Sequence, residues 1–164
     1  MTAQEIVDIL HLSPLAGEGG MYRSTYVSLQ EADGAPVGSA IFYLLHGDAF
    51  SHLHRLTADE VWYWHAGAPL ELTELCPDGS AVTTFLGMDL ATGQIPQRAV
   101  RAGNWMGASV AKGYPQDFVL VSTHMSPAWS ETTSYTHGNR EELISRYPQA
   151  ADRIRRLTGD AIFF

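Results

Sequence analysis

The chain has 164 residues, a length typical of a single domain. Apolar residues make up 45% of it and charged residues only 17%, so the chain can bury a core and is too apolar to be disordered. The 18 acidic and 10 basic side chains give a net charge of −8 without a basic run, which argues against DNA, RNA or anionic lipid as a partner.

The first ten residues are predicted to form a short helix. Thr2 followed by Glu5 fits a capping box, and Ile6, Ile9 and Leu10 fall on one face. The segment has no basic n-region, which argues against a signal peptide, and no apolar run in the chain approaches the ~18 residues of a membrane helix. We therefore expect a cytoplasmic protein without a membrane partner.

From Met21 to about Met125 the sequence predicts short β-strands. Segments rich in β-branched and aromatic residues alternate with turn signals such as Asp33-Gly34, and no long helical period separates them. This pattern favours an antiparallel sandwich or barrel over βαβ units. The clearest predicted strands are 22–29, 39–45, 60–65, 70–75, 82–86, 105–111 and 118–125.

The end of the chain is predicted to be helical. Asn139 can cap a helix that has two glutamates in its first turn, and Pro148 interrupts that helix. A second helical piece over 149–157 carries three arginines near its C-terminal end. We interpret these arginines as an exposed helix end rather than an anion site.

The stretch 47–67 contains the residues best suited to metal binding or catalysis. His52 and His54 are two positions apart, a spacing that places both imidazoles on one face of a strand, and Glu60 follows within a turn's distance. Two histidines and a carboxylate that converge inside a barrel can hold a divalent transition metal with open coordination positions.

At this point the chain resembles the cupin superfamily, whose first motif contains glycine, His-x-His, Glu and a second glycine in that order. The matching residues are Gly47, His52, His54, Glu60 and Gly67. Gly47 is one residue too close to His52, and Glu60 is one residue too far from His54. Asp59 occupies the alternative register.

The resemblance sharpens to one branch, the uncharacterised family called DUF985 or cupin-5, over about residues 15 to 148. Its ordered motifs appear here as Glu18-Gly19-Gly20, Tyr22-Arg23-Ser24-Thr25-Tyr26, Ser51 with His54-Arg55, Asp59-Glu60 with Trp62, Leu86 through Gly93, Gly103-Asn104-Trp105, and Leu120-Val121 through Pro127. The resemblance implies an all-β fold, a double-stranded β-helix (the cupin jelly-roll barrel) with short N-terminal and C-terminal helices. It also implies one domain over 1–164, with the barrel at about 20–128 and a helical segment at about 139–158, and a homodimer.

One departure from the family pattern bears on metal binding. The second cupin motif commonly supplies a last metal ligand from a histidine, and here that position is Met106, whose thioether is a poor ligand for hard or borderline metals. Cys76 is the single cysteine, so a cysteine zinc cluster is excluded. His52, His54 and Glu60 remain as a three-ligand set for iron, zinc, nickel or manganese.

The same residues also support chemistry that needs no cofactor. His54 is a candidate acid/base residue, with Glu60 or Asp59 as its partner, because a nearby carboxylate can raise the pKa of an imidazole. Arg23 and Arg55 have two open interpretations. They either tie down loops by pairing with Asp59 or Glu60, or clamp a substrate carboxylate or phosphate.

The aromatic residues of the predicted strands are either core or the wall of a pocket, and inside a small barrel these interpretations overlap. The predicted substrate-binding residues are Arg23, Tyr43, Ser51, Arg55, Trp62, Trp64, Trp105 and Met106.

A fold does not define a function, and three hypotheses remain. The first is an enzyme that isomerises, epimerises, cyclises or eliminates from a small polar or aromatic metabolite by acid/base chemistry at His54, Glu60 and Asp59. The second is a metal-dependent dioxygenase or lyase that uses His52, His54 and Glu60. The third is a non-catalytic module that binds a small molecule.

Overall fold

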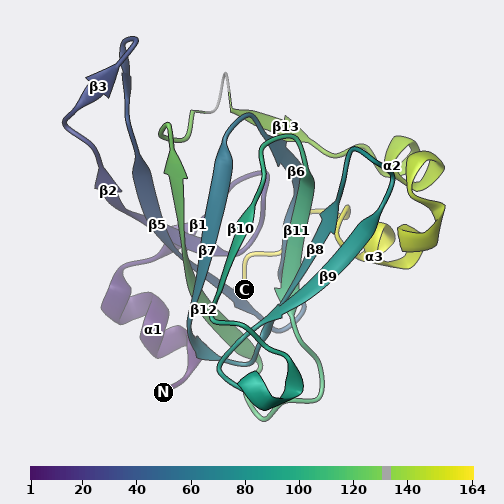
Figure 1. The fold of residues 1–164 in the computed structure, drawn as a ribbon. Coiled ribbons are helices and arrows are strands. Elements are labelled where there is room, and N and C mark those ends of the chain that lie inside the picture. Colours follow the sequence, from purple (N-terminus) through teal and green to yellow (C-terminus); the bar gives the residue numbers. More distant parts are fainter. Residues whose placement is uncertain (131–133) are drawn as a thin grey trace.

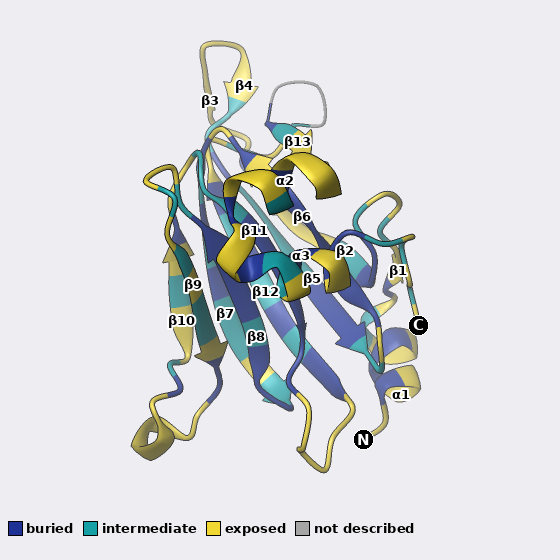
Figure 2. Ribbon diagram, turned by 90° about the vertical axis from the view of Figure 1, so that its right-hand side faces the viewer, coloured by how far each residue is buried: buried dark blue, intermediate teal, exposed yellow. Residues whose placement is uncertain are grey.

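Two antiparallel sheets face each other in the computed structural model, which describes residues 1–130 and 134–164 (Figure 1). The larger sheet has the strand order β1-β2-β5-β12-β7-β10, and the smaller has the order β13-β6-β11-β8-β9. A ribbon of β3 and β4 projects beyond one end of the barrel (Figure 2). Neighbours in each sheet are often distant in sequence, so each sheet is built from strands that cross between the two layers.

The strands have the following bounds. The larger sheet contains β1 (Ser13–Pro14), β2 (Met21–Val27), β5 (Ser39–His46), β12 (Phe118–Ser126), β7 (Asp59–Gly67) and β10 (Gln97–Val100). The smaller contains β13 (Tyr135–His137), β6 (Phe50–Leu56), β11 (Trp105–Val110), β8 (Leu70–Leu75) and β9 (Ala81–Leu86), and the ribbon contains β3 (Glu31–Ala32) and β4 (Ala35–Pro36). Each predicted strand segment is a strand, with ends within two residues of the prediction. The predicted strands do not include β10. They also do not include β6, although the prediction that His52 and His54 share one face assumes a strand there.

The main hydrophobic core fills the space between the two sheets. Tyr43 of β5 and Trp62 of β7 are 1% exposed and pack edge to face, with ring centroids 6.1 Å apart. Leu70 and Leu72 of β8 face them from the smaller sheet. Burying one such side chain contributes about 1.5–3 kcal/mol, so these inward positions hold the two sheets together.

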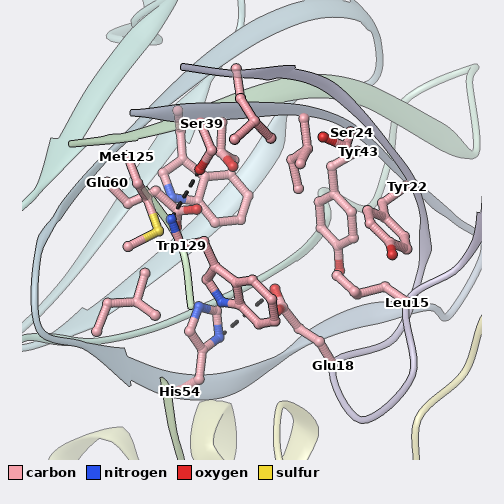
Figure 3. A pocket seen from close by; sticks show the side chains of 16 residues that line it. Leu15, Glu18, Tyr22, Ser24, Ser39, Tyr43, His54, Glu60, Met125 and Trp129 are labelled. Atoms are coloured by element: carbon pink, nitrogen blue, oxygen red, sulfur yellow. Dashed lines mark hydrogen bonds and ion pairs between the residues drawn. The ribbon is translucent and has the colours of Figure 1, made fainter. Parts of the chain in front are cut away.

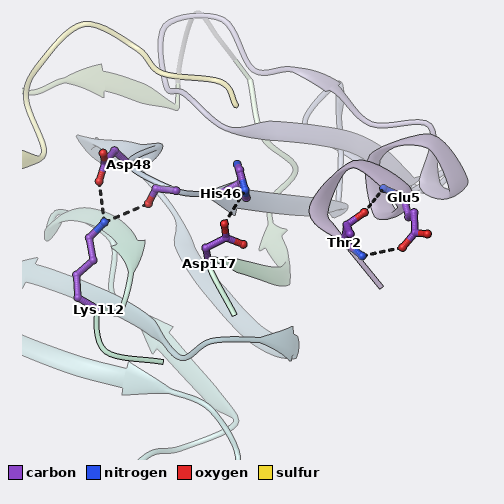
Figure 4. A network of polar contacts seen from close by, with 7 residues as sticks. Thr2, Glu5, His46, Asp48, Lys112 and Asp117 are labelled. Atoms are coloured by element: carbon purple, nitrogen blue, oxygen red, sulfur yellow. Dashed lines mark hydrogen bonds and ion pairs between the residues drawn. The ribbon is translucent and has the colours of Figure 1, made fainter. Parts of the chain in front are cut away.

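Helix α1 (Ala3–Leu10) packs on the outer face of the larger sheet, where its buried side chains contact Leu44 and Phe118. The predicted capping box is confirmed: the Thr2 hydroxyl accepts from Glu5 N at 3.2 Å, and Thr2 N donates to Glu5 Oε2 at 2.7 Å (Figure 4). The predicted face was partly wrong. Ile9 is 64% exposed, because the face of the helix that contacts the sheet consists of Ala3, Ile6 and Val7.

The C-terminal helices cover the outer face of the smaller sheet (Figure 2). They are α2 (Arg140–Arg146), the 3-10 turn η2 (Pro148–Ala150) and α3 (Ala151–Arg156); another 3-10 turn, η1 (Leu90–Thr92), follows β9. Asn139 caps α2 as predicted, because its Oδ1 accepts from Glu142 N at 3.1 Å. Leu143 and Ile154 pack against Leu53, so β6 has a covered outer face as well as an inner one.

The arginines of α3 pair with carboxylates. Arg156 contacts Glu71 at 2.7 Å, and Arg155 contacts Asp152 at 2.8 Å. None of the helices in the described ranges has the length and apolar character needed to span a bilayer.

Candidate functional site

A cavity of about 300 Å³ lies between the two sheets, and its walls are mostly apolar (Figure 3). The volume is at the lower end of the range of ligand pockets, which suits a molecule of modest size. The apolar and aromatic lining residues are Leu15, Tyr22, Val27, Ala40, Ile41, Tyr43, Leu56, Trp62, Met125 and Trp129. The polar lining residues are Glu18, Ser24, Ser39, His54, Glu60 and Thr123.

Glu18 enters the cavity from the turn that connects β1 and β2. Gly19 and Gly20 follow it with positive φ angles of 98° and 67°, which side chains with a Cβ rarely adopt. A Cβ on Gly19 would overlap the carbonyl oxygen of Phe50. The Gly19 carbonyl accepts a hydrogen bond from the Tyr43 hydroxyl at 2.9 Å, which ties the turn to the wall. The Glu-Gly-Gly motif therefore fixes a carboxylate at the cavity.

His54 comes from β6, where a bulge lies opposite Gly107 of β11. The bulge brings Ser51 and His54, three positions apart, to the same carboxylate. Ser51 Oγ donates to Glu18 Oε1 at 2.8 Å, and His54 Nδ1 lies 3.9 Å from that oxygen.

The environment of His54 assigns a role to each ring nitrogen. Nδ1 lies 2.7 Å from the His52 carbonyl oxygen, which can only accept, so Nδ1 carries a proton. In the neutral ring Nε2 is therefore the free acceptor, the form that a general base needs. Tyr135 of β13 stacks on the ring with centroids 5.1 Å apart and fixes its plane.

Glu60 reaches the cavity from β7, in the sheet opposite His54 (Figure 3). Burial, with a smaller effect from the negative charge of Glu18, raises the pKa of the carboxyl to about 7, although His54, Thr123 and Trp62 lower it. Glu60 Oε2 and Trp62 Nε1 are both buried and find no hydrogen-bond partner among the described residues. The carboxyl can therefore hold or release a proton near neutral pH.

Five of the predicted polar residues do not line the cavity: Ser51, His52, Asp59, Arg23 and Arg55. Asp59 accepts from Ala102 N at 2.8 Å and from Arg101 Nη1 at 2.6 Å, and these contacts hold its pKa below the usual value. The guanidinium of Arg23 lies over the Phe42 ring at 5.6 Å, on the face of β2 that turns away from the cavity. Arg55 is exposed and lies over the Trp105 ring at 4.9 Å. The predicted anion clamp and the predicted pairs with Asp59 or Glu60 were therefore wrong for both arginines.

The predicted aromatic residues divide between the two sides of the wall. Tyr43 and Trp62 line the cavity as expected. Trp105 lies on the outer face among the C-terminal helices, because its neighbour Met106 faces the barrel core. Trp64 packs against that core and donates from Nε1 to the Ala68 carbonyl at 3.0 Å, away from the cavity.

The residues present do not fit the expected metal site. His52 stacks on His137 with centroids 3.7 Å apart, and its Nδ1 lies 2.9 Å from the Leu53 carbonyl. Met106, in the position of the missing ligand, is fully buried opposite His54. Over residues 1–130 and 134–164, no three His, Cys, Asp or Glu side chains are grouped to hold a metal ion.

Several lining residues were missed at the sequence level. Glu18 was noticed in a motif but given no role, although a carboxylate beside two glycines is a usable signal. Tyr22 and Ser24 are two positions apart on β2 and therefore lie on the same face, a spacing that could have identified both as lining residues. Met125 has no predicted role, yet it lines the cavity and lies opposite Glu60. Trp129, 48% exposed at the rim of the cavity, carries no sequence signal.

The family described as Cupin superfamily (DUF985), Cupin_5, matches residues 4–135. The chain belongs to this family. It is similar over 98% of its length to the crystal structure of protein SO0799 from Shewanella oneidensis, at 34% identity and a TM-score of 0.89 over 99% of that chain. A hypothetical protein from Leishmania major matches at 27% identity and the same TM-score of 0.89, with 98% of this chain and 100% of that chain covered.

More distant cupins share the fold alone. A mutant of Bacillus subtilis oxalate decarboxylase matches 91% of this chain and 38% of its own, at 13% identity and a TM-score of 0.56. No curated protein matches the chain. The expected cupin jelly roll with short terminal helices is confirmed, and the Cupin_5 relatives with high TM-scores carry no activity in their names.

Proposed function

We propose that this cupin is an enzyme that moves a proton within a small molecule held in the barrel cavity. The observation that carries the proposal is Glu60, a buried carboxyl with a pKa raised to about 7 and a free oxygen, in the same cavity as His54. Carboxyls with raised pKa values cluster at sites of general acid/base catalysis, although structural networks also produce them.

The two groups belong to opposite sheets, so they approach a bound molecule from different sides. His54 Nε2 takes a proton from a carbon next to a substrate carbonyl, and the electron pair moves onto the carbonyl oxygen. The N–H of Trp62, which has no partner within the described chain, donates to that oxygen as it gains charge. The electron pair then moves back from the oxygen and protonated Glu60 returns a proton to carbon, which gives epimerisation at the same carbon or isomerisation at a neighbouring one; in an elimination Glu60 gives its proton to the leaving group instead.

The other hypotheses receive less support. A non-catalytic binding module would use the same cavity, but it needs no carboxyl with a pKa near neutral pH. A metal-dependent dioxygenase or lyase would need ligands that the described side chains do not group together. The homodimer, the cytoplasmic location and the single domain over 1–164 stay predictions.

Hydrogen exchange tests the proposal without knowledge of the substrate. We would incubate the protein with mixtures of small carbonyl metabolites in D₂O and look for mass increases by mass spectrometry. We expect one or more compounds to gain deuterium with the wild-type protein and with the control variant Asp59→Asn, whose carboxyl lies outside the cavity. His54→Gln should lose the exchange. Glu60→Gln should slow it at least about 100-fold, because the His54 imidazole can return a solvent deuteron but without the general acid. Exchange at the wild-type rate in Glu60→Gln would refute the assignment of that carboxyl.

A further inference from the structure

We propose that the cavity takes uncharged carbonyl compounds with an apolar body and excludes carboxylates and phosphates. The inference rests on the proposed function, because it concerns the same cavity and the same reacting groups. It adds the substrate class, which is uncharged, whereas an arginine clamp would select an anion.

The charges that line the cavity argue against an anion. Glu18 and Glu60 supply two carboxyls, and no lysine or arginine lines the cavity in the described part of the chain. The two arginines nearest in sequence to lining residues, Arg23 and Arg55, lie over Phe42 and Trp105 on outward faces. An anion would therefore lose its water shell and meet the negative charge of Glu18, and that of Glu60 once it ionises, with no counter-ion among these lining residues to replace the water.

The polar atoms without partners argue for a single oxygen on the ligand. Trp62 Nε1 is a donor, and Glu60 Oε2 belongs to a carboxyl that can donate when protonated. Glu60 and Trp62 are two positions apart on β7, so their side chains lie on the same face of the strand and line the same part of the wall. A carbonyl oxygen has two lone pairs, so before proton transfer it can accept from both groups at once, and Trp62 remains its donor once Glu60 has passed its proton to carbon.

The remaining wall suits the apolar body of such a compound. Tyr43 and Trp62 form one side with their edge-to-face rings, and Leu56, Ile41 and Met125 complete the apolar surface. The Tyr43 hydroxyl already donates to Gly19, so it leaves its ring, and not its polar atom, for the ligand.

Three planar probes of nearly equal size separate charge from shape: acetophenone is neutral, benzoate is an anion and benzamidinium is a cation. Each would be titrated into ¹⁵N-labelled wild-type protein while the indole N–H signals are recorded. We expect acetophenone to move the Trp62 signal and to bind at least about tenfold more tightly than benzoate, a factor that corresponds to a single interaction of moderate strength. The Trp64 and Trp105 signals serve as internal controls, because both rings lie outside the cavity.

Two variants test the oxygen site itself. Trp62→Phe keeps an aromatic ring but removes the donor, and it should weaken acetophenone binding about threefold or more if the N–H is used. Asp59→Asn should bind as the wild type does. The wild-type titration decides the question even where Trp62→Phe fails to fold.

The outcomes separate this inference from the proposed function. Benzoate or benzamidinium binding as tightly as acetophenone, or a Trp62 signal that none of the probes moves, would overturn the substrate class. Proton transfer is tested separately, by deuterium exchange on metabolites. If the wild-type protein prefers acetophenone but catalyses no exchange, the proposed enzymatic activity is refuted and the proposed ligand class stands.

Discussion

Replacing Glu60 with glutamine should change how the stability of the fold depends on pH. In the folded chain the pKa of Glu60 is about 7, because the carboxyl is buried, whereas its ordinary value is 4.5. Between these two pH values the folded state holds a proton that the unfolded state has released. The free energy of unfolding should therefore fall as the pH rises through this window, and should stop falling above pH 7.

The size of the effect follows from the two pKa values. Raising the pKa from 4.5 to about 7 corresponds to about 3 kcal/mol, at 1.36 kcal/mol per pKa unit. The stabilising contribution of Glu60 is complete below pH 4.5 and lost above pH 7. A glutamine amide does not titrate, so the Glu60→Gln variant should gain up to about 3 kcal/mol relative to the wild type between pH 5 and pH 8.

Urea unfolding at pH 5, 6, 7 and 8 measures this difference. The matched control is Asp59→Asn, the neighbouring carboxyl, whose pKa is held below its usual value and therefore does not titrate in this range. Burial also lowers the pKa of His52, His65 and His137, which changes stability in the same window. These histidines are present in every variant, so the difference between wild type and variant isolates Glu60.

Parallel curves for the wild type and Glu60→Gln would refute the reasoning. They would mean that the carboxyl stays solvated or finds a partner, and that its pKa is ordinary. The proposed acid/base role would then lose its physical basis. A constant offset between such parallel curves would report only the replacement of one carboxyl oxygen by an amide nitrogen in a buried position.

Two further substitutions test the geometry. Gly19→Ala should cost at least about 2 kcal/mol in urea unfolding, because its Cβ would overlap the Phe50 carbonyl at a positive φ, whereas Gly17→Ala, whose Cβ meets open space, should cost only about 1 kcal/mol. Equal costs would contradict the close approach. His52→Ala should lose about 1–2 kcal/mol with its stack on His137 but keep deuterium exchange, and loss of exchange would show that His52 takes part in the reaction.

The strands could be predicted from sequence because segments rich in β-branched and aromatic residues are separated by turn signals. Leu70 through Leu75 was predicted with both ends correct. Strand β6 escaped the segment list because His52, Leu53 and His54 break the alternation at the bulge, and the bulge depends on the partner strand β11. β10 is four residues long and carries too few apolar side chains to form a pattern.

The site was predicted in part, and its main errors follow from one rule. Successive side chains of a strand point to opposite faces. Once His54 is placed inward, Arg55 has to face outward, and the same holds for Trp105 beside inward Met106. Applied to these neighbours, the rule would have removed Arg55 and Trp105 from the predicted substrate-binding residues.

Glu18 could not be placed in the same way. It belongs to a turn, so no periodicity defines its direction, and its position depends on two glycines with positive φ angles and on contacts with Ser51, a residue 33 positions later. Such long-range placement of a loop carboxylate requires the assembled barrel.

Lysine is rare in this chain, and the position of the single one has a practical consequence. Lys112 precedes β12 and contacts Asp48 at 2.7 Å (Figure 4). Trp129, at the rim of the cavity, follows the other end of that strand. The nine residues of β12 separate the two ends by roughly 25–30 Å. Coupling to a sensor surface through the Lys112 amine would therefore attach the protein by the end opposite the rim and present the rim to the flowing ligand.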